Sequence, residues 1–214
     1  MDLTALRKFM FLHDYIPSFI QKPTEVKKNS VEETLGSQDL FIPKYKDTLF
    51  WCFYIIHYGW QEFFFIRKNH FKIEKETKIN IIEKLRLQKK INSLENDLLN
   101  NKIISLTTFL HLCAFFSINV IVIHDHFYYK NISNETDTIF YLRKYKHRFG
   151  IDSRKKIHKI INGFLALENI KKPILPFYKL KVNDIKTMCR QLNLPTKGNK
   201  RELYNTIKIK INEN

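Results

Sequence analysis

The order of hydrophobic and polar positions predicts that helices come first and strands follow. An apolar run at 49–56, with Asp47 or Thr48 as its cap, predicts a central helix buried on every side. Apolar residues then recur at helical spacing through 71–99, which predicts one long or two broken amphipathic helices. A third buried helix is expected at 107–116.

Strand patterns begin where this third helix ends. The β-branched run 118–123 predicts a buried strand, and 127–129 and 138–145 predict two more. Segment 153–172 fits either a helix or an extended chain. Helices followed by strands are the order of an α+β protein. We therefore expect a mostly helical main domain with a small β-sheet.

A linker and a change of pattern follow the main domain. Pro173 and Pro176 interrupt regular structure. Beyond them, apolar residues have the spacing of one buried stripe on a short helix. These residues are Val182, Ile185, Cys189 and Leu192. We expect an N-terminal helix and loop at 1–43, the α+β domain at 44–172 and a separate module at 173–214.

A second short helix is expected after an extended loop. Pro195 disfavours a helical conformation in the residue before it, and Gly198 supplies a flexible turn. Asn199 and Glu202 have the spacing of a capping box, which begins a helix. Its inward stripe is formed by Leu203, Ile207 and Ile211. The module is thus predicted to be a helix, an extended loop and a helix.

This module resembles the SAP family of helix–extended loop–helix DNA-binding modules. The matching positions are Val182, Ile185, Cys189, Leu194, Pro195, Gly198, Lys200, Leu203 and Ile207. The resemblance implies binding to duplex DNA, often AT-rich, with little reading of bases. Thr206 departs from the pattern, because family members often carry Arg there. That departure puts one backbone contact in doubt.

The distribution of charge also indicates a polyanionic partner. The formal net charge is +16; residues 141–214 hold 19 Lys and Arg against 5 Asp and Glu, and residues 1–140 hold 18 against 16. Nucleic acid is the commonest partner of such a basic segment, whereas a membrane binder needs a long one-sided amphipathic helix. The predicted DNA-binding residues lie off the apolar stripes and are Lys186, Arg190, Lys197, Gly198, Lys200 and Arg201. The alternative is that these charges only solubilise a helical cap.

The main domain raises the question of cysteine chemistry. Segment 105–123 resembles the corresponding region of papain-like and OTU-type cysteine proteases, and His147 follows a strand, where such folds place the general base. A reactive thiolate needs the start of a helix, but Cys52 lies near the second turn. Aligned on Leu49–Phe50, the nucleophile position falls on Thr48. The resemblance therefore implies a degenerate, inactive relative, with Cys52 and His147 as the catalytic candidates if there is activity.

Other candidate sites are weaker. His124 and His126 could share one face of a strand, but no third or fourth metal ligand stands at suitable spacing, so we expect no metal. We expect no cofactor either, since the chain has only 5 Gly and lacks phosphate-binding glycine loops. Tyr178 and Tyr204 could stack on bases, but packing in the core or hinge is favoured for both.

The sequence thus predicts a non-enzymatic DNA-associated protein that binds the duplex backbone. Two alternatives remain: a DNA-targeted viral cysteine peptidase or deubiquitinase, and a virion core protein that neutralises genome charge. The overall pattern is similar to proteins of large nucleocytoplasmic DNA viruses, which implies work in the host cytoplasm (a virus factory), the nucleus or the virion, with other viral proteins as partners. An odd number of spaced cysteines indicates reduced thiols in an intracellular setting: Cys52, Cys113 and Cys189.

Overall fold

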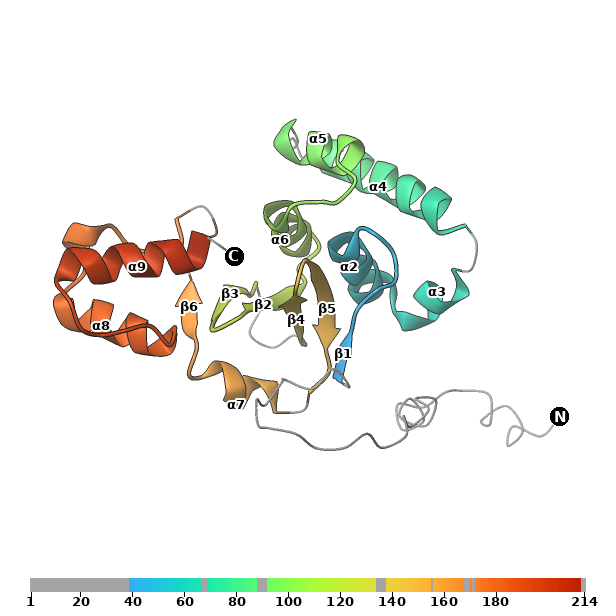
Figure 1. Cartoon of the computed structure of the whole chain (residues 1–214). Coiled ribbons are helices and arrows are strands. Elements are labelled where there is room, and N and C mark those ends of the chain that lie inside the picture. Colours follow the sequence, from blue (N-terminus) through green and yellow to red (C-terminus); the bar gives the residue numbers. More distant parts are fainter. Residues whose placement is uncertain are drawn as a thin grey trace, which may run out of the picture. The chain divides into compact units, whose positions relative to one another are not determined.

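The computed structural model describes a set of segments drawn in colour in Figure 1: residues 39–66, 69–87, 92–133, 138–154, 156–167, 170 and 172–212. They belong to one compact unit, residues 36–214. The N-terminal helix expected within 1–43 lies outside the described residues. No helix in these segments is both long and apolar enough to cross a membrane.

The central buried helix is α2 (Thr48–Tyr58), which confirms the prediction. Asp47 is its N-cap, because the Asp47 carboxylate accepts a hydrogen bond from the Phe50 N–H at 3.1 Å. Every residue from Thr48 to Ile55 is buried, as expected for a helix that is apolar on all sides. A short helix, α3 (Trp60–Phe65), follows at once.

The amphipathic stretch forms two helices. They are α4 (His70–Leu87) and α5 (Asn92–Asn100). The third predicted helix is α6 (Leu106–Phe115), whose N-cap Ser105 accepts a hydrogen bond from the Thr108 N–H. Element type is therefore confirmed for every helix that the sequence predicted in the main domain.

The sheet is larger than the sequence indicated. It is mixed and has six strands in the order β1-β5-β4-β2-β3-β6 within the described part of the chain (Figure 1). The strands are β1 (Leu40–Phe41), β2 (Asn119–His124), β3 (Phe127–Asn131), β4 (Ile139–Tyr145), β5 (Arg148–Asp152) and β6 (Leu165–Leu167). The α+β class is confirmed, whereas the sequence did not predict strands β1 and β5.

Strand β2 lies inside the sheet, and its side chains pack into a hydrophobic cluster on each face of the sheet. It pairs with β3 antiparallel and with β4 parallel. Val120 and Val122 belong to the main core, which also contains α2 and α6 residues. The alternate residue Ile121 points to the other face, where it clusters with residues of α7 (Ile157–Ile161). The buried run 118–123 is explained by this two-sided cover.

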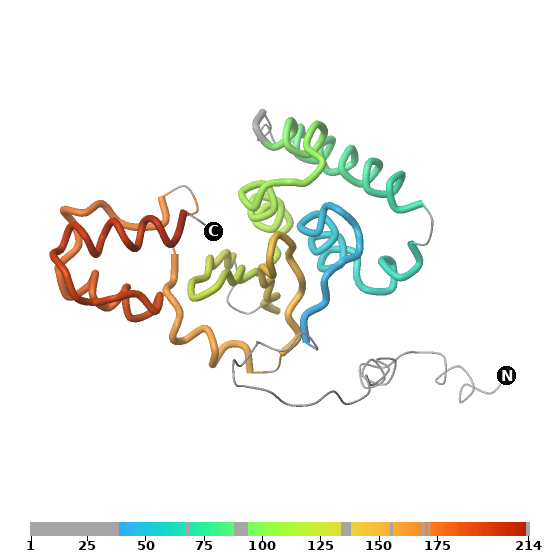
Figure 2. Tube along the Cα trace, viewed as in Figure 1, coloured from blue at the N-terminus to red at the C-terminus, as the bar shows by residue number. Residues whose placement is uncertain are grey.

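Segment 153–172, for which the sequence allowed either a helix or an extended chain, contains one of each. A helix, α7, is followed by a strand, β6, which pairs with β3 in parallel. The chain then enters a 3-10 helix, η3 (Phe177–Lys179), and two α-helices, α8 (Val182–Gln191) and α9 (Lys200–Asn212). Figure 2 shows this last part as the tube that turns back on itself, with α8 and α9 packed together.

Both predicted stripes of the helix pair are buried. They consist of Ile185, Cys189 and Leu192 on the first side, and Leu203, Ile207 and Ile211 on the second. Val182 is the exception, because its side chain is 42% exposed. It is the first residue of α8 and lies beyond the end of the packed stripe, so its assignment to the core was wrong.

Candidate nucleic-acid interface

The two helices of the module are each fixed at their start by a carboxylate. In α8 the Lys181 N–H donates to the Asp184 carboxylate at 2.9 Å. In α9 the predicted capping box is confirmed: the Asn199 N–H donates to Glu202 at 3.0 Å, and the Glu202 N–H donates to the Asn199 side chain at 2.9 Å. The start of each helix is therefore set by residues three apart in sequence.

The loop between the helices depends on Gly198. Its φ of +134° lies in a region that favours glycine. A Cβ built on Gly198 would stand 2.9 Å from the Glu202 Oε2, one of the capping-box atoms. The loop thus requires glycine both for its backbone conformation and for the space beside the cap.

The predicted cations lie around this loop and face solvent to differing degrees. Arg190, Lys197 and Arg201 are exposed, as is Gly198, whereas Lys186 and Lys200 are half-buried. Among the residues that the structure describes, none of these five side chains forms a salt bridge. Their charges are therefore not neutralised by a carboxylate of the described residues.

An aromatic turn packs beside the start of α9. The Lys200 Nζ lies 4.4 Å from the centre of the Phe177 ring, and that ring meets Tyr204 edge to face at 5.5 Å. The Tyr204 hydroxyl donates to the Leu175 carbonyl at 3.0 Å. Tyr204 thus packs as expected. Tyr178 does not, because its side chain is 78% exposed, and the expectation of core or hinge packing was wrong for it.

Polar contacts also join the module to the turn between β2 and β3. The Lys210 Nζ lies 2.7 Å from the Asp125 carboxylate. The Asn193 amide lies within hydrogen-bond distance of the His126 ring, at 3.1 Å. Buried residues of α8 and α9 belong to the same hydrophobic cluster as the sheet and α2. The helix pair is therefore held by apolar packing as well as by these contacts.

Comparison with known families agrees with this geometry. A family model described as SAP domain matches residues 177–208. This segment is a SAP domain. The match includes η3, α8, the loop and most of α9, and a SAP domain suggests binding to DNA or chromatin. Neither the curated proteins nor the solved structures include one that matches the chain. The match extends to no other segment, so viral origin and a cysteine-protease fold stay predictions.

Cys52 lies in the core beneath strand β5. The residue is fully buried, and its thiol donates to the Phe149 carbonyl at 3.7 Å. Burial raises the pKa of the Cys52 thiol far above its ordinary value, and the nearby Asp47 carboxylate adds to the shift. Thr48 accepts the Phe149 N–H at 3.0 Å. Phe149 thus contacts both candidate nucleophiles, while His147 is exposed in the turn before β5.

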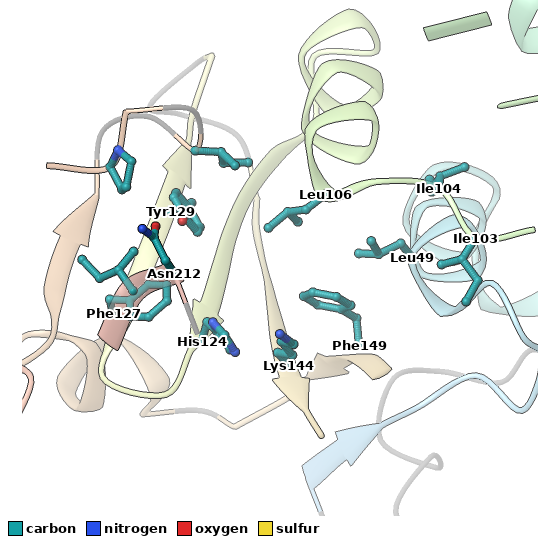
Figure 3. A pocket seen from close by; sticks show the side chains of 13 residues that line it. Leu49, Ile103, Ile104, Leu106, His124, Phe127, Tyr129, Lys144, Phe149 and Asn212 are labelled. Atoms are coloured by element: carbon teal, nitrogen blue, oxygen red, sulfur yellow. The ribbon is translucent and has the colours of Figure 1, made fainter. Parts of the chain in front are cut away.

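His124, the last residue of β2, and His126, in the turn that follows, have different surroundings. His126 contacts the SAP domain, whereas His124 is half-buried and lines a pocket of about 450 Å³. Figure 3 shows His124 and Lys144 close together, with apolar residues around most of the pocket. Burial lowers the pKa of His124 to about 4, and the Lys144 charge contributes, so the imidazole is neutral at pH 7. Within the described segments, no group of three or more metal-binding side chains is found.

Proposed function

We propose that this chain is a non-enzymatic, DNA-associated protein whose SAP domain binds the phosphate backbone of duplex DNA with little sequence preference. The observation that carries the proposal is the set of cations around the loop and the start of α9, which form no salt bridge within the described residues. Cations left without a counter-charge are the groups that phosphates neutralise.

The geometry favours contacts to phosphates over contacts to bases. Lys186 and Arg190 are one helical turn apart, so they project from the same side of α8. The capping box of α9 uses the N–H groups of Asn199 and Glu202, which leaves the first-turn N–H groups of Lys200 and Arg201 for a phosphate oxygen. Contacts of this kind set the position on DNA without reading its sequence.

The main domain supports a non-enzymatic role. A thiol nucleophile reacts as the thiolate, and burial of Cys52 opposes the formation of that anion. The α+β domain would then serve as a scaffold that brings the SAP domain, and what is attached to it, to DNA. We place this work in packaging, tethering or transcription, in the nucleus or in a viral factory or virion.

The test measures binding of the full chain to two duplexes of equal length and unrelated sequence by fluorescence anisotropy. We expect similar affinities for the two, and a marked loss for both when Lys197, Lys200 and Arg201 are all changed to Gln. A second variant carries Lys102→Gln and Lys130→Gln, two exposed lysines outside the SAP domain, and should bind almost as the wild type does. Strong preference for one duplex, or undiminished binding by the triple variant, would overturn the proposal.

A further inference from the structure

An aromatic side chain stands out of the SAP domain at Tyr178. The residue lies in the middle of η3 and is the most exposed aromatic of the SAP domain. In the described part of the chain, no ring contact or side-chain hydrogen bond of Tyr178 is present. Other large apolar residues close to it in sequence are also exposed: Leu175, Phe177 and Val182. Exposed apolar residues gathered in one segment are typical of a binding surface.

The position of Tyr178 links it to the phosphate-binding residues. Its neighbour Phe177 lies under the Lys200 ammonium group, at the start of α9. On the other side of Tyr178, both Lys179 and Lys181 are exposed. Tyr178 therefore lies in the chain between the residue that contacts Lys200 and an exposed lysine, Lys179. A strand held by these cations would bring its bases near the ring.

The turn that carries the ring is fixed by its own contacts. The Lys179 N–H donates to the Pro176 carbonyl at 2.9 Å. Tyr204 holds the chain on the other side, through its hydroxyl bond to Leu175 and its ring contact with Phe177. A turn that is already fixed loses little conformational freedom on binding, so its exposed ring can stack on a flat group at a low entropy cost.

We infer that Tyr178 stacks on an unpaired nucleobase, so that the SAP domain binds DNA with an exposed base, such as a bulge, a gap or a single-stranded segment, more tightly than it binds an intact duplex. The inference rests on the proposed function, because the backbone contacts bring the base to the ring. In an intact duplex each base face is covered by its neighbours, whereas an unpaired base offers a free face. Stacking on an aromatic side chain accepts any base, which agrees with binding that reads little sequence.

The experiment uses the full chain and two DNA duplexes that differ in one nucleotide. One carries 2-aminopurine as a single unpaired bulge, and the other carries the same base paired within an intact duplex. Stacking on an aromatic ring quenches the fluorescence of 2-aminopurine. The variants are Tyr178→Phe, which keeps the ring, and Tyr178→Leu, which keeps apolar area without it. Tyr145→Leu is the matched control, since Tyr145 is another exposed tyrosine beside a lysine and lies outside the SAP domain.

The expected result is quenching on the bulged DNA by the wild type, by Tyr178→Phe and by Tyr145→Leu, and its loss with Tyr178→Leu. The preference for bulged over intact DNA should fall by about 5- to 150-fold in Tyr178→Leu. If Tyr178→Leu keeps both quenching and preference while duplex binding stays salt-dependent, the inference is overturned, the proposed function stands, and the exposed ring serves a different partner such as a protein. If the wild type binds neither DNA at low salt, the proposed function fails, and the inference with it.

Discussion

The number of phosphate contacts that we propose for the SAP domain can be counted from the salt dependence of binding. Each phosphate that a protein cation neutralises releases counterions, which makes the slope of log K against log salt concentration about −0.9 per contact on B-DNA. The SAP domain presents five candidate cations: Lys186, Arg190, Lys197, Lys200 and Arg201. If all five contact phosphates, the slope is about −4.5, and affinity falls about 500-fold between about 50 and 200 mM salt.

Changing both Lys197 and Arg201 to Gln should remove two of these contacts. The slope then becomes about −2.7, and the loss of affinity over the same range shrinks to about 40-fold. These two side chains are exposed and form no salt bridge among the described residues, so their replacement should leave the fold intact. Circular dichroism and the thermal midpoint check that expectation.

The assay is a titration of labelled duplex at several salt concentrations, with affinity taken from anisotropy. The control carries Lys102→Gln and Lys130→Gln, which lowers the net charge by the same amount away from the SAP domain. Its slope should stay near that of the wild type, because the slope counts contacts and not total charge. An equal drop of slope in the control and in the double variant would refute the reasoning.

Further expectations concern the buried ion pairs, the loop and the thiols. Lys78→Met should lower the free energy of unfolding by about 3–5 kcal/mol, because the Lys78 Nζ lies 2.8 Å from the buried Asp47 carboxylate. Urea denaturation measures this loss. The control Lys75→Met, at an exposed lysine of the same helix, should cost far less. Burial raises the pKa of the Asp47 carboxyl, so the wild type should lose stability relative to Asp47→Asn as pH rises above 3.8, and a relative gain would contradict this. Gly198→Ala should destabilise the SAP domain by about 1–3 kcal/mol because of the positive φ, whereas Gly163→Ala, which meets no atom within 4 Å, should be nearly neutral in a thermal melt. All three cysteines are buried, so none should react quickly with a thiol reagent or with a thiol-reactive ubiquitin probe in the native protein. Rapid labelling that is abolished by Cys52→Ala would instead favour a peptidase.

Strand β5 illustrates what a local pattern hides. Its sequence holds Gly150 between charged ends, which reads as a break in regular structure. In the structure the glycine allows a close approach, because a Cβ there would stand 2.6 Å from the Phe41 carbonyl oxygen of β1. The strand exists because β4 and β1 pair with it on both sides. The β1 pairing joins residues about a hundred positions apart and leaves no short-range signal, whereas β4 and β5 form a hairpin of residues close in sequence.

Tyr178 shows the same limit in the candidate sites, whereas the apolar run around Cys52 already predicted that this residue is buried. Tyrosine is often buried, and the neighbours of Tyr178 in sequence do not decide its burial. Tyr178 is exposed because Phe177 takes the place beside Lys200 and Tyr204. For Cys52 the structure adds a partner far away in sequence, because β5 brings the Phe149 carbonyl to its thiol.

The sequence by itself determined the SAP helix pair, its loop and the cations around it. Helix stripes, the Asn199–Glu202 cap and the glycine turn depend on residues within a few positions of one another, so a local pattern is sufficient to predict them. Only the tertiary structure decided the order of the strands and the exposure of Tyr178. These properties depend on segments far apart in sequence, whose packing is set by the whole hydrophobic core.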